Sequence, residues 1–161
     1  MRRTARAVAS CCLGMFFCVS LAMSADRPRI TKAVLGTGVT DKYEIVNATG
    51  EFPPDAPAIH CAWKAEGVAA GTHFRGVFIA EDVGKVAPPN YKIDEATVNL
   101  DSDGAGSFTL SKPDNGFPVG KYRLDIYIGD DLAKTLRFRC QGKIVGDRAV
   151  AVERQHMHGD S

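Results

Sequence analysis

Two histidines near the C-terminus are the residues of this sequence that most resemble transition-metal ligands. His156 and His158 lie two positions apart, beside Met157 and close to Asp160. Histidine clusters of this kind bind soft or borderline divalent ions. The segment around them is polar, however, and two ligands on a loose chain do not fix the geometry that selects a metal. We therefore expect incidental histidines and no cofactor, with a metal-binding tail as the alternative.

The remaining polar residues form no recognisable catalytic arrangement. Asp101-Ser102-Asp103-Gly104 begins like a calcium loop, but Lys112 occupies the twelfth position, where such a loop needs a bidentate glutamate. We interpret the segment as a hairpin turn. No Gly-x-Ser-x-Gly elbow, phosphate-binding loop or dinucleotide fingerprint occurs in the sequence. We expect no catalytic residues and no enzyme activity, and an enzyme with a site assembled from scattered residues is the alternative.

The segment from residue 81 to residue 91 is a candidate binding surface. It is too long for a hairpin turn, it mixes apolar residues with charge, and Pro88-Pro89 stiffens it. Recognition usually takes place on loops of this length, with aromatic residues as anchors. We predict that a partner contacts Val83, Val86, Asn90 and Tyr91, with Tyr91 as the anchor. The alternative is a plain connection that crosses an edge of the fold.

The first 25 residues have the order of a secretory signal peptide. Arg2, Arg3 and Arg6 form a cationic start, residues 7–22 are largely apolar, and small residues lead up to Ala25. The apolar run is shorter and more diluted than the roughly 20 residues that a membrane helix needs. We expect cleavage and export to the periplasm or beyond, without a stable membrane anchor. An uncleaved anchor is the alternative.

Cys61 and Cys140 are the two cysteines that remain once the signal peptide is removed. An even pair in an exported protein predicts one disulfide, here closing a loop that is worth about 4.5 kcal/mol in a chain-entropy account. Each cysteine falls on the apolar side of an alternating segment, so both are expected to face the interior. Two buried free thiols are the alternative, because buried cysteine packs as a small hydrophobe.

Composition and charge indicate one ordinary globular domain. The chain has 161 residues, of which 45% are hydrophobic and 24% charged, with 20 Lys and Arg against 19 Asp and Glu. The net charge of +1 falls to −2 when the three arginines of the signal peptide are removed. This near-neutral balance offers no basic surface for nucleic acid.

Alternation of apolar and polar residues predicts the strands that must position these residues. Period-two patterns predict half-buried strands at residues 59–64, 95–100, 107–111, 122–128 and 135–140. Residues 30–35 and 72–80 are apolar on both sides, which also suits strands. We find no convincing amphipathic helix. Seven short antiparallel strands predict an all-β, immunoglobulin-like two-sheet sandwich over residues 26–142, and polar residues 143–161 predict a loose tail.

Two motifs add a resemblance to this pattern. The first is Gly71 to Phe78 (GTHFRGVF), and the more distinctive one is Asn115 to Leu124 (NGFPVGKYRL). From about Phe52 to Cys140 the chain resembles an Ig-like domain of many exported bacterial proteins of unknown function. Similar domains usually have tryptophan where this chain has Phe117. The resemblance implies a fold and an exported location, and it implies no activity.

The tyrosine of the second motif is expected to serve folding. Tyr122 begins the buried side of a strand, so its hydroxyl needs a partner, typically a nearby backbone group. The sequence therefore predicts an exported, non-enzymatic Ig-like module that binds an unknown protein or another component of the cell envelope. The alternative function is a periplasmic metal-binding protein that uses the histidine tail.

Overall fold

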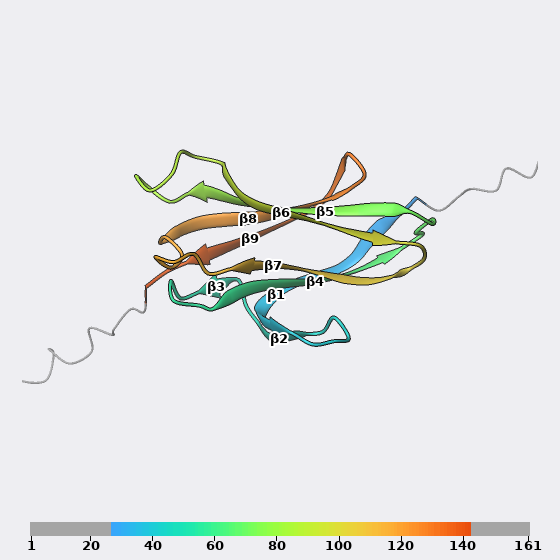
Figure 1. Cartoon of the computed structure of the whole chain (residues 1–161), viewed down its shortest axis with the longest axis horizontal. Helices are drawn as coiled ribbons and strands as arrows, with labels where there is room; N and C mark the ends of the chain where they lie inside the picture. The colour runs from blue at the N-terminus through green and yellow to red at the C-terminus, as the bar shows by residue number, and fades with distance from the viewer. Residues whose placement is uncertain (1–26, 143–161) are drawn as a thin grey trace, which may run out of the picture.

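The computed structural model describes residues 27–142, and all of the regular structure in this range is β-strand (Figure 1). The predicted signal peptide and the predicted tail, with His156 and His158, lie outside the described residues. The nine strands are β1 (Arg29–Val39), β2 (Ile45–Ala48), β3 (Glu51–Phe52), β4 (Ala58–Glu66), β5 (Thr72–Asp82), β6 (Tyr91–Leu100), β7 (Gly104–Ser111), β8 (Gly120–Ile128) and β9 (Asp131–Cys140).

The strands form two stacked sheets (Figure 1). One sheet has four strands in the order β2-β1-β4-β7, and the other has five in the order β3-β9-β8-β5-β6. All neighbours are antiparallel except β3 and β9. In an immunoglobulin-like sandwich the first, second and fifth major strands share one sheet and the third, sixth and seventh share the other. Strands β1, β4 and β7 and strands β5, β8 and β9 follow this rule, so the predicted fold class is confirmed.

Each of the seven predicted strands lies within an observed strand, and two strands were missed. Strand β3 has two residues and β2 has four, three of them exposed. Neither is long enough to show a periodic pattern. The interpretation of residues 101–104 as a hairpin turn is wrong, because β6 and β7 belong to different sheets. Instead the carboxylates of Asp101 and Asp103 accept hydrogen bonds from the backbone amides of Gly71 and Val68 at 2.9 and 2.8 Å.

Aromatic rings fill the space between the sheets. The ring of Trp63, from β4, stacks on that of Phe74 from the other sheet at a centroid distance of 4.5 Å, and on that of Phe108 at 5.7 Å. Nearer the end of the sandwich, Tyr122 stacks on Phe138 at 5.3 Å. The Tyr122 hydroxyl donates a hydrogen bond to the Pro118 carbonyl, as the sequence predicted. Stacked rings of this kind contribute about 0.5–1.5 kcal/mol per pair beyond the area that they bury.

Two glycines let these rings lie against the backbone. A Cβ atom on Gly106 would stand 2.5 Å from Cζ2 of Trp63, and one on Gly76 would stand 2.7 Å from the Phe108 ring. Both distances are shorter than van der Waals contact. Because the rings are buried on all sides, they have no free space into which to move.

We predict that Gly106→Ala lowers the free energy of unfolding by about 1–3 kcal/mol, because the new methyl group overlaps the indole of Trp63. The control is Gly104→Ala in the same strand, where the nearest atom to the new Cβ is Cδ1 of Leu100 at 3.6 Å. This control should change the free energy by less than about 0.5 kcal/mol. Urea denaturation of both variants measures the difference, and equal midpoints would contradict the packing argument.

Candidate functional site

The connections from β5 to β6 and from β7 to β8 lie at the same end of the sandwich (Figure 1). Residues of both connections line an uncharged groove of about 430 Å³. Pro88 and Tyr91 line one side, Pro113 and Pro118 line the other, and Val83 lies in the floor. None of the thirteen residues that line it carries a charge. The volume is within the range of pockets that bind small molecules or single side chains of a partner. We call this feature the loop groove.

The walls of the loop groove are fixed by backbone hydrogen bonds. The amide of Phe117 donates to the Pro54 carbonyl at 2.8 Å, and the amide of Gly116 donates to the Pro113 carbonyl at 2.8 Å. The amide of Asn90 donates to the carbonyl of Glu81 at 3.2 Å, which closes the base of the other wall. Phe117 is itself buried. The second sequence motif therefore builds one wall of the groove as well as the entry into β8.

The structure separates the four residues that were predicted to contact a partner. Val86 and Tyr91 line the loop groove and are 70% and 52% exposed. Val83 also lines it, but its side chain is buried in the core cluster. Asn90 does not line it: it has a left-handed backbone (φ 59°), and its side-chain oxygen accepts a hydrogen bond from Nη1 of Arg123 at 2.6 Å. Asn90 thus holds the loop in shape.

Arg123 belongs to a charge network on the outer face of the five-stranded sheet. Its Nε donates to Asp125 at 2.9 Å, and its Nη1 lies 3.3 Å from the carboxylate of Glu81, which Arg137 also contacts at 3.1 Å. Asp125 is the one buried charged residue within residues 27–142, and it accepts a second hydrogen bond from Thr135 at 2.6 Å. The hydrogen bond that Arg123 donates to Asp125 is the main cause that raises the pKa of Arg123.

This network is a structural feature of the outer face. Its donors are Arg123 of β8 and Thr135 and Arg137 of β9, and its acceptors include Glu81 of β5 and Asp125 of β8. Sequence analysis did not predict this network, because Arg123 and Asp125 look like ordinary solvent-facing residues of an alternating strand. The pairing of β5, β8 and β9 brings them together.

The predicted disulfide is not formed: Cys61 and Cys140 are both buried free thiols. Each faces the core, as expected, but from a different sheet and at a different height. Cys140 ends β9 at the end of the sandwich where β4 begins, whereas Cys61 lies three residues into β4, between Leu35 and Phe108 (Figure 1). Burial raises the pKa of the Cys61 thiol to about 12 and that of Cys140 to about 11.

No metal site and no membrane-spanning helix were found in the part of the chain that the structure describes. Residues 27–142 contain no group of three or more His, Cys, Asp or Glu side chains that could hold a metal ion. The ring of His60 contacts the Thr109 hydroxyl at 3.0 Å, and that of His73 contacts Asn99 at 2.7 Å. Within the same range, no helix is long and apolar enough to cross a membrane.

The sequence matches no protein-family model and no curated protein. Among solved structures, the chain is similar to an immunoglobulin-like protein from Pseudomonas aeruginosa, with 17% identity and a TM-score of 0.49 over 73% of this chain and 99% of that one. It is also similar to β-glucosidases from Bifidobacterium adolescentis and Trichoderma reesei, each at 13% identity, with TM-scores of 0.40 and 0.39. These two matches cover 17% and 19% of the enzymes. At these levels of similarity, none of the likenesses assigns an activity to this chain.

We predict that Cys61 and Cys140 resist alkylation in the folded protein at pH 8, because burial keeps both thiols protonated and out of reach. The protein comprising residues 26–161, unfolded without reductant, should then take up two alkyl groups per chain. Mass spectrometry distinguishes the outcomes. If the denatured chain takes up no alkyl group until a reductant is added, the two cysteines form the disulfide that the sequence predicted.

Proposed function

We propose that this protein is an exported, non-enzymatic binding module that holds an apolar segment of a partner protein in the loop groove. The observation that carries the proposal is the uncharged lining, with Val86 and Tyr91 at its mouth and prolines in both walls. Exposed apolar side chains that cluster around a concave surface indicate an interaction site, whereas single exposed apolar side chains are common on any protein.

The chemistry of the lining favours an apolar occupant. Tyr91 offers an aromatic ring with little conformational entropy to lose, and aromatic residues in such positions dominate binding energy. A charged partner side chain would lose its hydration in the groove without gaining an opposite charge. The three prolines and the backbone hydrogen bonds of the walls keep the groove open before binding, which lowers the entropic cost of association.

Export gives this module its place of action. The signal-peptide pattern of the first 25 residues supports a site of action in the periplasm or outside the cell, where the partner is a protein or another envelope component. The fold supports a binding role by analogy, since sandwich loops commonly carry recognition. The proposal itself depends on the groove, because a fold does not determine a function.

Selection of peptides from a displayed random library against residues 26–161 tests the proposal. We expect enriched peptides to share apolar or aromatic anchors, and their binding to change little with salt, because the groove has no charge to screen. The amide signals that shift on binding should cluster in residues 83–91 and 113–119. Selected peptides that shift only other regions would contradict the proposal.

The matched variant is the double substitution Val86→Ser and Tyr91→Ser. Both side chains are more than half exposed, so the melting temperature should stay nearly unchanged while peptide binding falls at least tenfold. The control is Val119→Ser, which alters another exposed apolar side chain (61%) that does not line the groove. Equal loss of binding in the control and the double variant would mean that general surface hydrophobicity drives the binding.

A further inference from the structure

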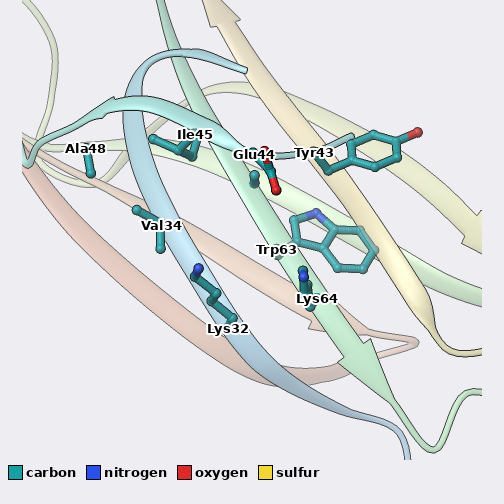
Figure 2. A pocket seen from close by; sticks show the side chains of 9 residues that line it. Lys32, Val34, Tyr43, Glu44, Ile45, Ala48, Trp63 and Lys64 are labelled. Atoms are coloured by element: carbon teal, nitrogen blue, oxygen red, sulfur yellow. The ribbon is translucent and has the colours of Figure 1, made fainter. Parts of the chain in front are cut away.

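A second cavity lies on the outer face of the four-stranded sheet, on the side away from the core. Val34 of β1 and Ala62 of β4 are paired across the two strands and form its floor. The segment that joins β1 to β2 covers it with Tyr43 and Glu44, together with Ile45, the first residue of β2. Its volume is about 370 Å³. Figure 2 shows this arrangement, with the covering segment passing over β1 and β4. We call this feature the roofed cavity.

Two lysines stand side by side at the roofed cavity. Lys32 of β1 and Lys64 of β4 are direct cross-strand partners, and both line the cavity (Figure 2). Like charges placed directly opposite each other destabilise a sheet. Neither ammonium group forms an ion pair with any side chain in residues 27–142. By contrast, Arg29, which also lies in β1, pairs with Glu66 of β4 at 2.7 Å.

A β-bulge creates this lysine pair. The register of β1 on β4 shifts by one residue between Ile30 and Lys32. Without this shift Lys32 would lie opposite Trp63, and its side chain would point into the core. Bulges that re-aim a side chain occur preferentially beside functional sites. The shift therefore places the charge of Lys32 beside that of Lys64 at the cavity. This repulsion lowers the stability of the sheet, and the fold does not need the pair.

The covering segment of the roofed cavity, which we call the roof, contains a residue with left-handed backbone. Tyr43 has φ 56°, a left-handed conformation that an aromatic residue rarely adopts and that costs about 1–3 kcal/mol. The amides of Lys42 and Glu44 both donate to the Thr40 hydroxyl, and the amide of Tyr43 donates to the Thr40 carbonyl. Gly36 lets the roof lie close to β1, since a Cβ atom there would stand 2.3 Å from the Ile45 side chain.

We propose that the roofed cavity binds an acidic sugar, a pyranose ring that carries a carboxylate. The two ammonium groups can bind an anion, and the carboxylate of Glu44 can accept a hydrogen bond from a hydroxyl group. Val34, Ala62 and the Tyr43 ring require an apolar face, which the C–H side of a sugar ring presents. A free phosphate lacks the apolar face, a fatty acid lacks the hydroxyl groups, and a neutral sugar lacks the charge.

The volume and net charge of the cavity agree with this ligand. The two lysines and one glutamate leave one uncompensated positive charge, which a single carboxylate neutralises. The cavity lies within the range of sites that hold small ligands. This site is separate from the loop groove, because the two have no lining residue in common. The proposal for the roofed cavity can therefore be tested independently of the proposed function.

Titration of the protein with four probes, followed by amide chemical shifts, tests the proposal. The probes are glucuronate, glucose, octanoate and inorganic phosphate. We expect glucuronate to bind in the millimolar range, with shifts in residues 32–36, 43–48 and 62–64, and to bind at least fivefold more tightly than the other three. Its affinity should fall as the salt concentration rises from about 0.02 M to about 0.3 M.

Three variants test the role of the lysines and of the roof. Lys32→Gln and Lys64→Gln should each weaken glucuronate binding about fivefold and raise stability slightly, because the like-charge pair is removed. Tyr43→Asn should leave the melting temperature unchanged or higher, since asparagine tolerates left-handed backbone, and should also weaken binding. The control is Lys42→Gln, in the same segment but outside the cavity lining, which should stay within twofold of the parent protein.

Four outcomes would overturn the proposal. Glucose that binds as tightly as glucuronate would remove the role of the lysines, and phosphate or octanoate that binds as tightly would remove the requirement for a sugar ring. Equal weakening by Lys42→Gln would show that the whole surface attracts anions without a site. The proposal is also wrong if no probe shifts the signals of the roofed cavity.

Discussion

The stacking of Trp63 between two aromatic rings is the contact on which the rest of the molecule depends. Its indole lies on Phe74 of the opposite sheet and on Phe108 of the neighbouring strand, and it is 1% exposed. Since neither cysteine is oxidised, no covalent bond ties the sheets together within residues 27–142. Burial of apolar and aromatic surface therefore supplies the main force between the sheets.

The tight core has a consequence for the backbone around it. Gly76 lets β5 lie against the Phe108 ring of the other sheet, and Gly106 lets β7 lie against the Trp63 ring. Nε1 of Trp63 is buried without a hydrogen-bond partner among the described residues. An unsatisfied buried donor costs about 1–3 kcal/mol. The fold tolerates this cost because the same ring buries a large apolar area on both of its faces.

A rigid sandwich leaves its loops and outer faces available for binding, and here two surfaces differ in chemistry. The loop groove is uncharged and lies at one end of the sandwich, whereas the roofed cavity carries two lysines and a glutamate on an outer face. The first suits an apolar protein segment and the second an acidic sugar.

The sequence by itself determined the class of fold and most of its strands. Alternation of period two marks a strand because successive side chains point to opposite faces, and this rule is local. This rule located five of the seven major strands and placed Cys61 and Cys140 on the inner faces, and runs that are apolar on both sides located the other two. Sequence analysis also selected residues 81–91, which form one wall of the loop groove, because the length and proline content of a loop can be read from the sequence.

Only the tertiary structure decided which residues meet. Facing inward did not bring Cys61 and Cys140 together, because the distance between their sulfur atoms depends on the height of each residue along its strand, and no local pattern contains that height. The pairing of Lys32 with Lys64 depends on a one-residue bulge in β1, and the network around Asp125 depends on the pairing of β5 with the consecutive strands β8 and β9, which come much later in the sequence. Register and strand order are properties of the whole sheet, and they are set by the packing of all its residues together.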